Sequence, residues 1–280
     1  MIESPLPTLS AWVNALTDAE IPVLPRTAAE LKQLREIEDT RGTVDANMLA
    51  DALGTDPLMT LKVLTHVSRY CTRLSVEPPE TLTGAIVMQG ITPFFDAFSE
   101  VPTVIDWLNG EPEALSGLLK VITRSRRSAH FAMNFAIRRQ DEDAAVVHQA
   151  ALLHDFAEML LWCHAPKLAQ EIAKCLQSDH TLRSVAVQKV VLGAPLSAIG
   201  HELMHIWQLP DMLIKCTNDR LAQDPQVRSV MLAVQIARHT QYGWDDPHAQ
   251  AALHDDVSEV ARLLTVSHEV AERLLKAIDS

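Results

Sequence analysis

Apolar residues recur at intervals of three and four along much of the chain, as Leu49, Leu53, Leu58, Leu61 and Leu64 show. This spacing places side chains on one face of an α-helix, whereas a half-buried strand alternates apolar and polar residues. We find no convincing alternating run, and Ala and Leu dominate a chain that has only 9 Gly. The sequence therefore predicts an all-α fold.

Two short segments carry signals for the start of a helix. Asp56 and Pro57 mark one start, with Pro57 at the first helical position, where the missing N–H is not needed. Thr43 is predicted to cap a second helix that begins at Val44.

The turn-rich segment NGEPEALSG, residues 109–117, is the best candidate for a domain boundary. Short helices are expected before it, and a basic cluster followed by a strongly apolar helix comes after it. We therefore expect an N-terminal helical subdomain at 1–110 and a second helical subdomain at 111–280.

Charge and composition exclude several classes of protein. The chain has 24 Lys and Arg against 36 Asp and Glu, a formal net charge of −12. Such a protein repels phosphate backbones and anionic membranes, so nucleic acid is disfavoured as a main partner. No apolar run approaches the ~20 residues of a membrane span, and the start of the chain lacks the pattern of a signal peptide. The four cysteines form no CxxC pair. We expect a cytoplasmic protein with no membrane partner.

The stretch AAVVHQAALLHDFAEMLLWCHAP, residues 144–166, is apolar almost all round, which predicts one buried helix. It nevertheless contains His154 and Asp155, and His148 lies on roughly the same face as Asp155. A buried carboxylate is costly unless it is paired or bound to a metal. Two explanations remain open: Asp155 bonds a neighbouring donor within the core, or the His154-Asp155 pair holds a metal or a ligand.

The segment HELMH contains the His-Glu-x-x-His pattern of zinc peptidases, formed by His201, Glu202 and His205. Each histidine lies ~160° around the helix from Leu203, which belongs to the apolar stripe together with Ile206. The pair is therefore predicted to face away from the core, whereas a catalytic zinc needs a walled cleft and a third ligand. A zinc peptidase is the less favoured alternative, although an exposed pair of this spacing can bind zinc or nickel adventitiously.

Several segments in order resemble proteins of the HDOD family, the HD-related output domains of bacterial signalling. ALLHDFAEMLL is similar to the central segment of HD-domain phosphohydrolases, and four other segments resemble HDOD proteins: IPVLPRTAAELKQL, DANMLADALGTDPLMTLKVLTHVSRY, TGAIVMQGI and LGAPLSAIGHELMHIWQLPDML. The resemblance covers most of the chain. It implies an all-α fold in which an N-terminal helical subdomain packs on a degenerate HD-type helical core.

The resemblance also implies where an active HD site would hold its metals. His154 and Asp155 match the central pair, and Glu158 replaces the Lys that often follows it. The other ligands are expected where this chain has Arg127, Leu196, Asp219, Arg220 and Val234, although His130 lies one turn from the first of these. Most of the ligand set is thus lost, which predicts no metal, no cofactor and no catalytic residue.

What remains is a vestigial pocket, predicted to contain Arg127, His130, His148, His154 and Asp155. In one hypothesis, Arg127 points at Asp155 and replaces the positive charge of the lost metal. In a rival hypothesis, a basic cluster binds a small anionic second messenger or nucleotide. The cluster consists of Arg124, Arg126 and Arg127.

These patterns and the resemblance together predict a non-catalytic regulatory protein of bacterial signal transduction. It would act through a protein partner or by binding a small anionic ligand. The alternative is a metal-dependent phosphohydrolase acting on nucleotides, with a rearranged site built from His130, His148, His154 and Asp155.

Overall fold

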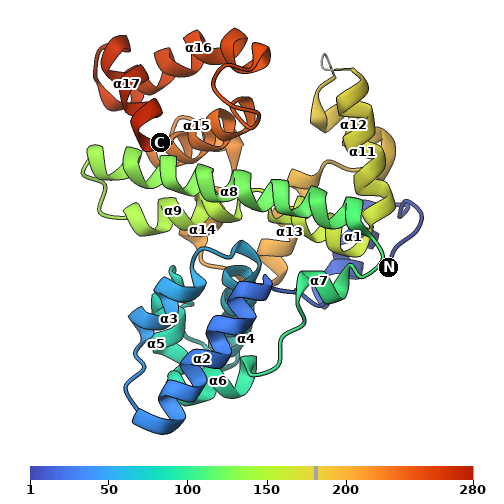
Figure 1. The fold of residues 1–280 in the computed structure, drawn as a ribbon, viewed down its shortest axis with the longest axis vertical. Helices are drawn as coiled ribbons and strands as arrows, with labels where there is room; N and C mark the ends of the chain where they lie inside the picture. The colour runs from blue at the N-terminus through green and yellow to red at the C-terminus, as the bar shows by residue number, and fades with distance from the viewer. Residues whose placement is uncertain (180–181, 280) are drawn as a thin grey trace. The chain divides into compact units, whose positions relative to one another are not determined.

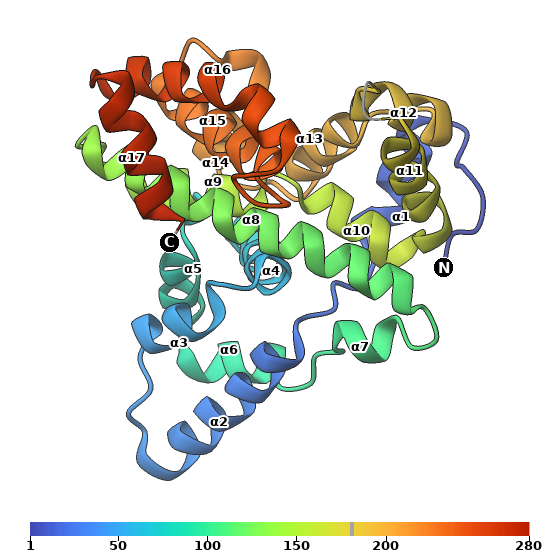
Figure 2. The same ribbon diagram turned by 45° about the horizontal axis from the view of Figure 1, so that its top comes forward.

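The computed structural model describes residues 1–179 and 182–279, and these residues are predominantly helical, with no strand among them (Figures 1 and 2). The all-α prediction is confirmed. In chain order, the helices are α1 (Leu9–Thr17), α2 (Pro25–Arg41), α3 (Ala46–Leu53), α4 (Pro57–Leu74), α5 (Leu82–Gln89), α6 (Ile91–Phe98), α7 (Val104–Trp107), α8 (Pro112–Arg138), α9 (Ala144–Leu153), α10 (Phe156–His164), α11 (Pro166–Ser178), α12 (Ser184–Leu192), α13 (Leu196–Ile206), α14 (Asp211–Cys216), the 3-10 turn η1 (Asp219–Leu221), α15 (Pro225–His239), α16 (Pro247–Leu264) and α17 (His268–Ile278). Within the described ranges, no helix combines the length and apolar character that a membrane crossing requires.

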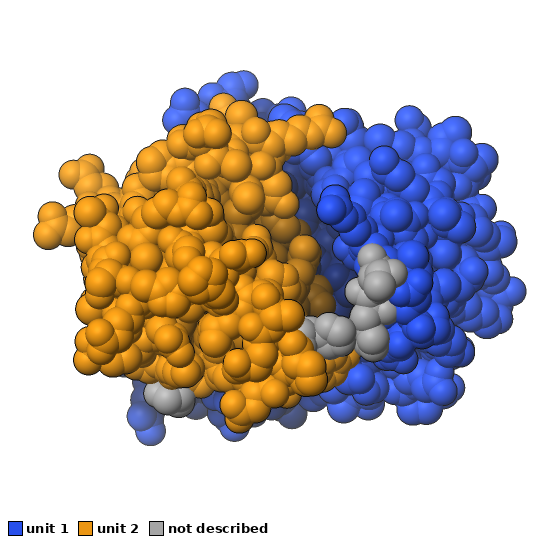
Figure 3. Space-filling model, turned by 90° about the horizontal axis from the view of Figure 1, so that it is seen from above, with its two compact units in different colours: residues 1–122, 155–210 blue, residues 123–154, 211–280 orange. Residues whose placement is uncertain are grey.

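The chain divides into two compact units, coloured separately in Figure 3. Unit 1 comprises residues 1–122 and 155–210, and unit 2 comprises residues 123–154 and 211–280. Each unit combines two stretches of the chain, so this division differs from the expected boundary at 110/111. The reason is that α8 begins at Pro112, inside the turn-rich segment 109–117, and continues to Arg138. The division between the units falls inside this helix.

In unit 1, two tryptophans connect α1 to the α12–α13 segment through hydrogen bonds of their indole N–H groups. The indole N–H of Trp12 donates to the carbonyl of Leu192 at 2.9 Å, and that of Trp207 donates to the carbonyl of Thr17, also at 2.9 Å. Both rings are buried. Each ring therefore leaves water without losing the hydrogen bond of its polar N–H group.

Asp56 joins the start of α2 to the start of α4 in unit 1. Its fully buried carboxylate accepts hydrogen bonds from the Leu24 N–H and the Thr27 hydroxyl at 2.8 Å, from the Leu58 N–H at 2.9 Å and from the Met59 N–H at 3.3 Å. One side chain thus satisfies donors at two helix N-termini. Burial raises the pKa of Asp56, and the four hydrogen bonds act in the opposite direction.

The predicted helix start at Asp56 and Pro57 is confirmed, because α4 begins at Pro57 with Asp56 as its cap. The predicted cap at Thr43 is wrong. Helix α3 begins at Ala46, and its cap is Asp45, whose side chain accepts from the Met48 N–H at 2.9 Å. A carboxylate two residues later than expected provides the acceptor.

The apolar stretch 144–166 forms two helices instead of the single helix that was expected. Helix α9 ends at Leu153 and α10 begins at Phe156, so that His154 and Asp155 form the turn between them. Helix α9 packs on α14 and α15, whereas α10 packs on α4, α11 and α13. The chain leaves unit 2 after His154 and enters unit 1 at Asp155. The two halves of the stretch are therefore buried in different cores.

We expect Asp56→Ala to lower the free energy of unfolding by about 2–4 kcal/mol, because four buried donors would lose their acceptor. Urea-induced unfolding followed by circular dichroism measures this loss. Asp45→Ala is the matched control, since it removes a single exposed cap and should cost about 1 kcal/mol. Equal losses in the two variants would show that Asp56 does not have the role described.

Candidate functional site

A pocket of about 260 Å³ lies within unit 2. Helix α15 supplies most of its wall, and the turn after α9 and the 3-10 turn η1 supply the remainder. The lining residues are His154, Asp219, Met231, Val234, Gln235, Arg238 and His239. Three of them, His154, Asp219 and Val234, are positions at which the resemblance implies metal ligands in an active HD site.

His154 pairs with a carboxylate at this pocket. Its Nε2 atom lies 3.1 Å from Oδ1 of Asp219. The imidazole is largely buried, with 9% of its side chain exposed, whereas 53% of the Asp219 side chain is exposed. The pair therefore places a carboxylate at the solvent edge and an imidazole behind it.

A second pair of an imidazole and a carboxylate, His239 and Asp256, contributes to the same pocket through His239. Nδ1 of His239 lies 2.7 Å from Oδ2 of Asp256, and the amide nitrogen of Gln235 donates to the other oxygen of that carboxylate at 2.8 Å. Asp256 is buried, and both its oxygens are hydrogen-bonded. This arrangement fixes the orientation of the His239 ring, because Nδ1 is held and Nε2 is the nitrogen that remains for another contact.

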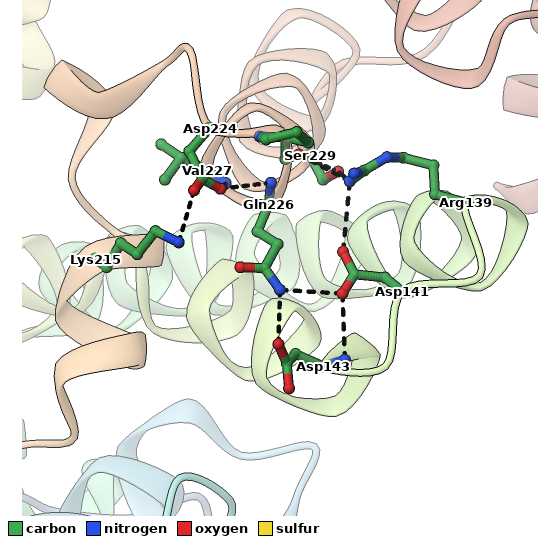
Figure 4. Close-up of polar contacts among 9 residues, drawn as sticks. Arg139, Asp141, Asp143, Lys215, Asp224, Gln226, Val227 and Ser229 are labelled. Carbon is green, nitrogen blue, oxygen red and sulfur yellow. Dashed lines mark hydrogen bonds and ion pairs between the residues drawn. The ribbon is translucent and has the colours of Figure 1, made fainter.

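The first turn of α15 is held by the polar network drawn in Figure 4. The amide of Gln226 donates to Asp141 at 3.0 Å and to Asp143 at 2.8 Å. Asp224 caps α15 by accepting from the Gln226 N–H at 2.9 Å, and it also pairs with Lys215 at 2.6 Å. These contacts tie α15 to the α8–α9 turn and to α14, which fixes the helix that carries the pocket wall.

Arg139 adds to this anchorage from the end of α8. Its guanidinium donates to the carbonyl of Pro225 at 2.9 Å and to the hydroxyl of Ser229 at 3.0 Å, and it lies 3.5 Å from the carboxylate of Asp141 (Figure 4). The carbonyl of Pro225 also accepts from the Ser229 hydroxyl at 2.9 Å.

Arg127 has a different partner from the one hypothesised. Its guanidinium forms a two-pronged ion pair with Asp279 at 2.8 and 2.6 Å, and it also donates to the hydroxyl of Thr240 at 2.7 Å and to the carbonyls of Thr240 and Ala237. The hypothesis that Arg127 neutralises Asp155 is therefore wrong, because a carboxylate 152 residues away along the chain already occupies the guanidinium.

The other predicted pocket residues are spread over several elements. Asp155 is buried at the start of α10 in unit 1, where its carbonyl accepts from the N–H groups of Glu158 and Met159. His130 is exposed on α8, and His148 is half-buried on α9. Of the five residues predicted to form the vestigial pocket, His154 lines the pocket described here.

The predicted basic cluster is divided in the same way. Arg126 is exposed and Arg124 is half-buried, whereas Arg127 is committed to Asp279. The arginine that does line the pocket is Arg238 on α15, which sequence reasoning missed. The available signal was the polar set Gln235, Arg238 and His239, which interrupts an apolar helix at spacings of three and four.

The donor set does not fit a divalent metal ion. Among the described residues, no three His, Cys, Asp or Glu side chains come together closely enough to hold one. Val234 offers no donor atom, and the Arg238 side chain contributes positive charge to the same pocket. Open catalytic sites generally keep three protein ligands, so these residues would hold an HD-type metal poorly.

The His-Glu-x-x-His segment lies on α13, with Leu203 fully buried, His205 exposed and His201 half-buried. The prediction that the histidines face away from Leu203 is confirmed. Ile206, which was expected in the buried stripe, is 48% exposed at the last position of the helix. Glu202 is exposed, and no third ligand joins the pair among the described residues.

Protonation of His148 should make stability depend on pH. Burial lowers the pKa of His148 below its usual value, and the nearby charge of His130 lowers it further. The unfolded chain then takes up a proton at a pH where the native protein does not, so stability is lost as the pH falls below about 6.5. We expect the free energy of unfolding to decrease from about pH 7 to pH 5, and His148→Gln to make this decrease smaller.

Urea unfolding at several pH values measures both curves. Burial also lowers the pKa values of His66 and His164, so a residual slope should remain in the variant. Parallel curves for the variant and the unmodified protein would contradict the assignment to His148.

Solved structures share this fold. The MmoQ response regulator from Methylococcus capsulatus str. Bath has a TM-score of 0.67 and 18% identity, over 92% of this chain and 99% of that one. A virulence factor from Campylobacter jejuni subsp. jejuni has a TM-score of 0.65 and 16% identity, over 93% and 92%. An HDOD domain protein with unknown function from Geobacter sulfurreducens has a TM-score of 0.50 and 16% identity, over 96% and 93%. At these identities the similarity shows the fold alone.

The comparison with curated proteins gave no significant match. The family model for the HDOD domain matches residues 21–222, which is more than half of the chain. The matched region includes the segment IPVLPRT, the His154-Asp155 turn and the whole of α13. The chain therefore belongs to the HDOD domain family.

Proposed function

We propose that this protein is a non-catalytic component of bacterial signal transduction. It acts by binding a small anionic ligand in the unit 2 pocket and by contacting a protein partner. The composition of the pocket wall supports this proposal most directly. At positions where the resemblance implies metal ligands, the wall keeps His154 but has Val234 at another position, and Arg238 stands beside them.

The physical argument concerns charge. A divalent cation in this pocket would share it with a guanidinium, which is always protonated, and the two positive charges would repel each other. The imidazole of His154 and the exposed carboxylate of Asp219 already bond to each other. The pocket wall can instead receive an anion, because Arg238 presents a fork of donors and Nε2 of His239 can add an N–H group.

The size of the pocket limits what it can enclose. Its volume of about 260 Å³ lies just below the range of ~300–1,000 Å³ that is usual for drug-sized ligands. Met231 and Val234 give the wall an apolar part, and Arg238, Gln235 and the imidazoles give it a polar part. A small organic anion, such as a phosphate or carboxylate on a compact apolar group, matches this combination.

The signalling role is also supported by the name of a structural neighbour. MmoQ, which shares the fold, is called a response regulator. In the proposed role, an anion bound in the pocket would change the surface that a partner protein recognises. No bond of the ligand would be broken.

We expect Arg238→Ala to weaken the binding of small phosphorylated ligands about tenfold, since it removes a charge-assisted contact from the pocket. Isothermal titration calorimetry with inorganic phosphate, nucleoside monophosphates and cyclic dinucleotides measures the affinity. Arg262→Ala is the matched control: Arg262 pairs with Glu259 on α16 and is absent from the pocket lining. Its binding curve should match that of the unmodified protein.

Two results would contradict the proposal. Metal-dependent hydrolysis of a nucleotide or another phosphate ester would establish the phosphohydrolase alternative, particularly if His130→Ala, His148→Ala or Asp155→Ala abolished it. If no anion gave a binding signal in calorimetry at millimolar concentration, the proposal that the pocket binds a small anion would be wrong.

A further inference from the structure

The two histidines of the HELMH segment have a geometry that the proposed function does not use. On α13, Nε2 of His201 lies 3.2 Å from Nε2 of His205. The two rings meet nearly edge to face, with centroids 4.5 Å apart and an interplanar angle of 86°. The Nε2 atoms of the two rings thus face each other at hydrogen-bond distance.

This nitrogen separation is the one that a shared metal ion requires. Histidine nitrogens bind zinc at about 2.0–2.1 Å, and bond angles of about 90–109° at the ion place two such nitrogens about 2.9–3.4 Å apart. The observed separation of 3.2 Å falls within this interval. We propose that His201 and His205 form a two-nitrogen chelate for a divalent transition-metal ion of the zinc, copper and nickel class.

The helix that carries the pair is firmly held, so the chelate is largely formed in advance. Leu203, between the two histidines, is fully buried, and Gly200 lies against Phe156, whose ring is 3.4 Å from where a Cβ at this position would be. The next residue after the helix, Trp207, is fastened by its indole hydrogen bond. With the backbone fixed, positions four apart on a helix remain neighbours, and little side-chain freedom is lost on binding.

The chemistry of the donors selects the class of ion. Imidazole nitrogen suits zinc, copper and nickel, whereas magnesium and calcium prefer oxygen ligands. Binding through Nε2 requires the proton of each neutral ring to lie on Nδ1. In the described part of the chain no third His, Cys, Asp or Glu completes the site, so water fills the remaining positions. The chelate therefore binds an ion without forming a peptidase centre.

The test uses the full-length protein without a polyhistidine tag. Calorimetric titration with zinc chloride should show one ion bound per chain, and His201→Ala and His205→Ala should each weaken binding about tenfold or more, because each leaves a single ligand. With copper(II), electron paramagnetic resonance should show two nitrogen donors in the unmodified protein and one in either variant. Circular dichroism without metal verifies that both variants keep the helical fold.

His254→Ala is the matched control. His254 is exposed, and its ring also lies beside that of another histidine, His268, at a centroid distance of 5.0 Å. This variant should bind zinc as the unmodified protein does. The proposal is overturned if the unmodified protein binds no zinc at millimolar concentration, if His254→Ala is the variant that loses binding, or if the copper spectrum keeps two nitrogens without His201 or His205. None of these results bears on the anion pocket, because the two sites share no residue.

Discussion

The fold depends on how one apolar stretch, residues 144–166, is shared between two cores. A helix that is apolar on every side needs neighbours on every side, and the structure meets this need by breaking the stretch at His154 and Asp155. Helix α9 is covered by α14 and α15, and α10 by α4, α11 and α13. The two polar residues lie at the turn, where a helix has unsatisfied backbone groups in any case. The position of His154 at the pocket is a result of this break.

The sequence predicted the class of fold and the family, because helical periodicity and ordered segments are local properties of the chain. The helix start at Asp56 and Pro57 could also be predicted, because a cap and its helix are adjacent in the sequence. The partner of Arg127 could not be predicted from the sequence, because Asp279 lies 152 residues away and only the packing of the helices brings the two side chains together. The same holds for Asp256, a buried carboxylate whose role depends on the neighbouring helix α15.

The pocket of unit 2 brings together polar groups that lie far apart in the sequence. Each of its two imidazoles is held by a carboxylate, at Asp219 and at Asp256. Arg238 contributes a permanent positive charge to the same wall, which also includes the carboxylate of Asp219. The network around Gln226 holds the start of the pocket helix, so these groups stand on a fixed backbone.

The ion pair between Arg127 and Asp279 joins α8 to the end of α17. Asp279 also accepts from the indole of Trp244 at 2.8 Å, so three distant segments meet at one carboxylate. Loss of this single carboxylate would leave the Arg127 guanidinium without its counter-charge and the Trp244 indole without its acceptor. Helices α8 and α17 would then be loosened together, although only one side chain had changed.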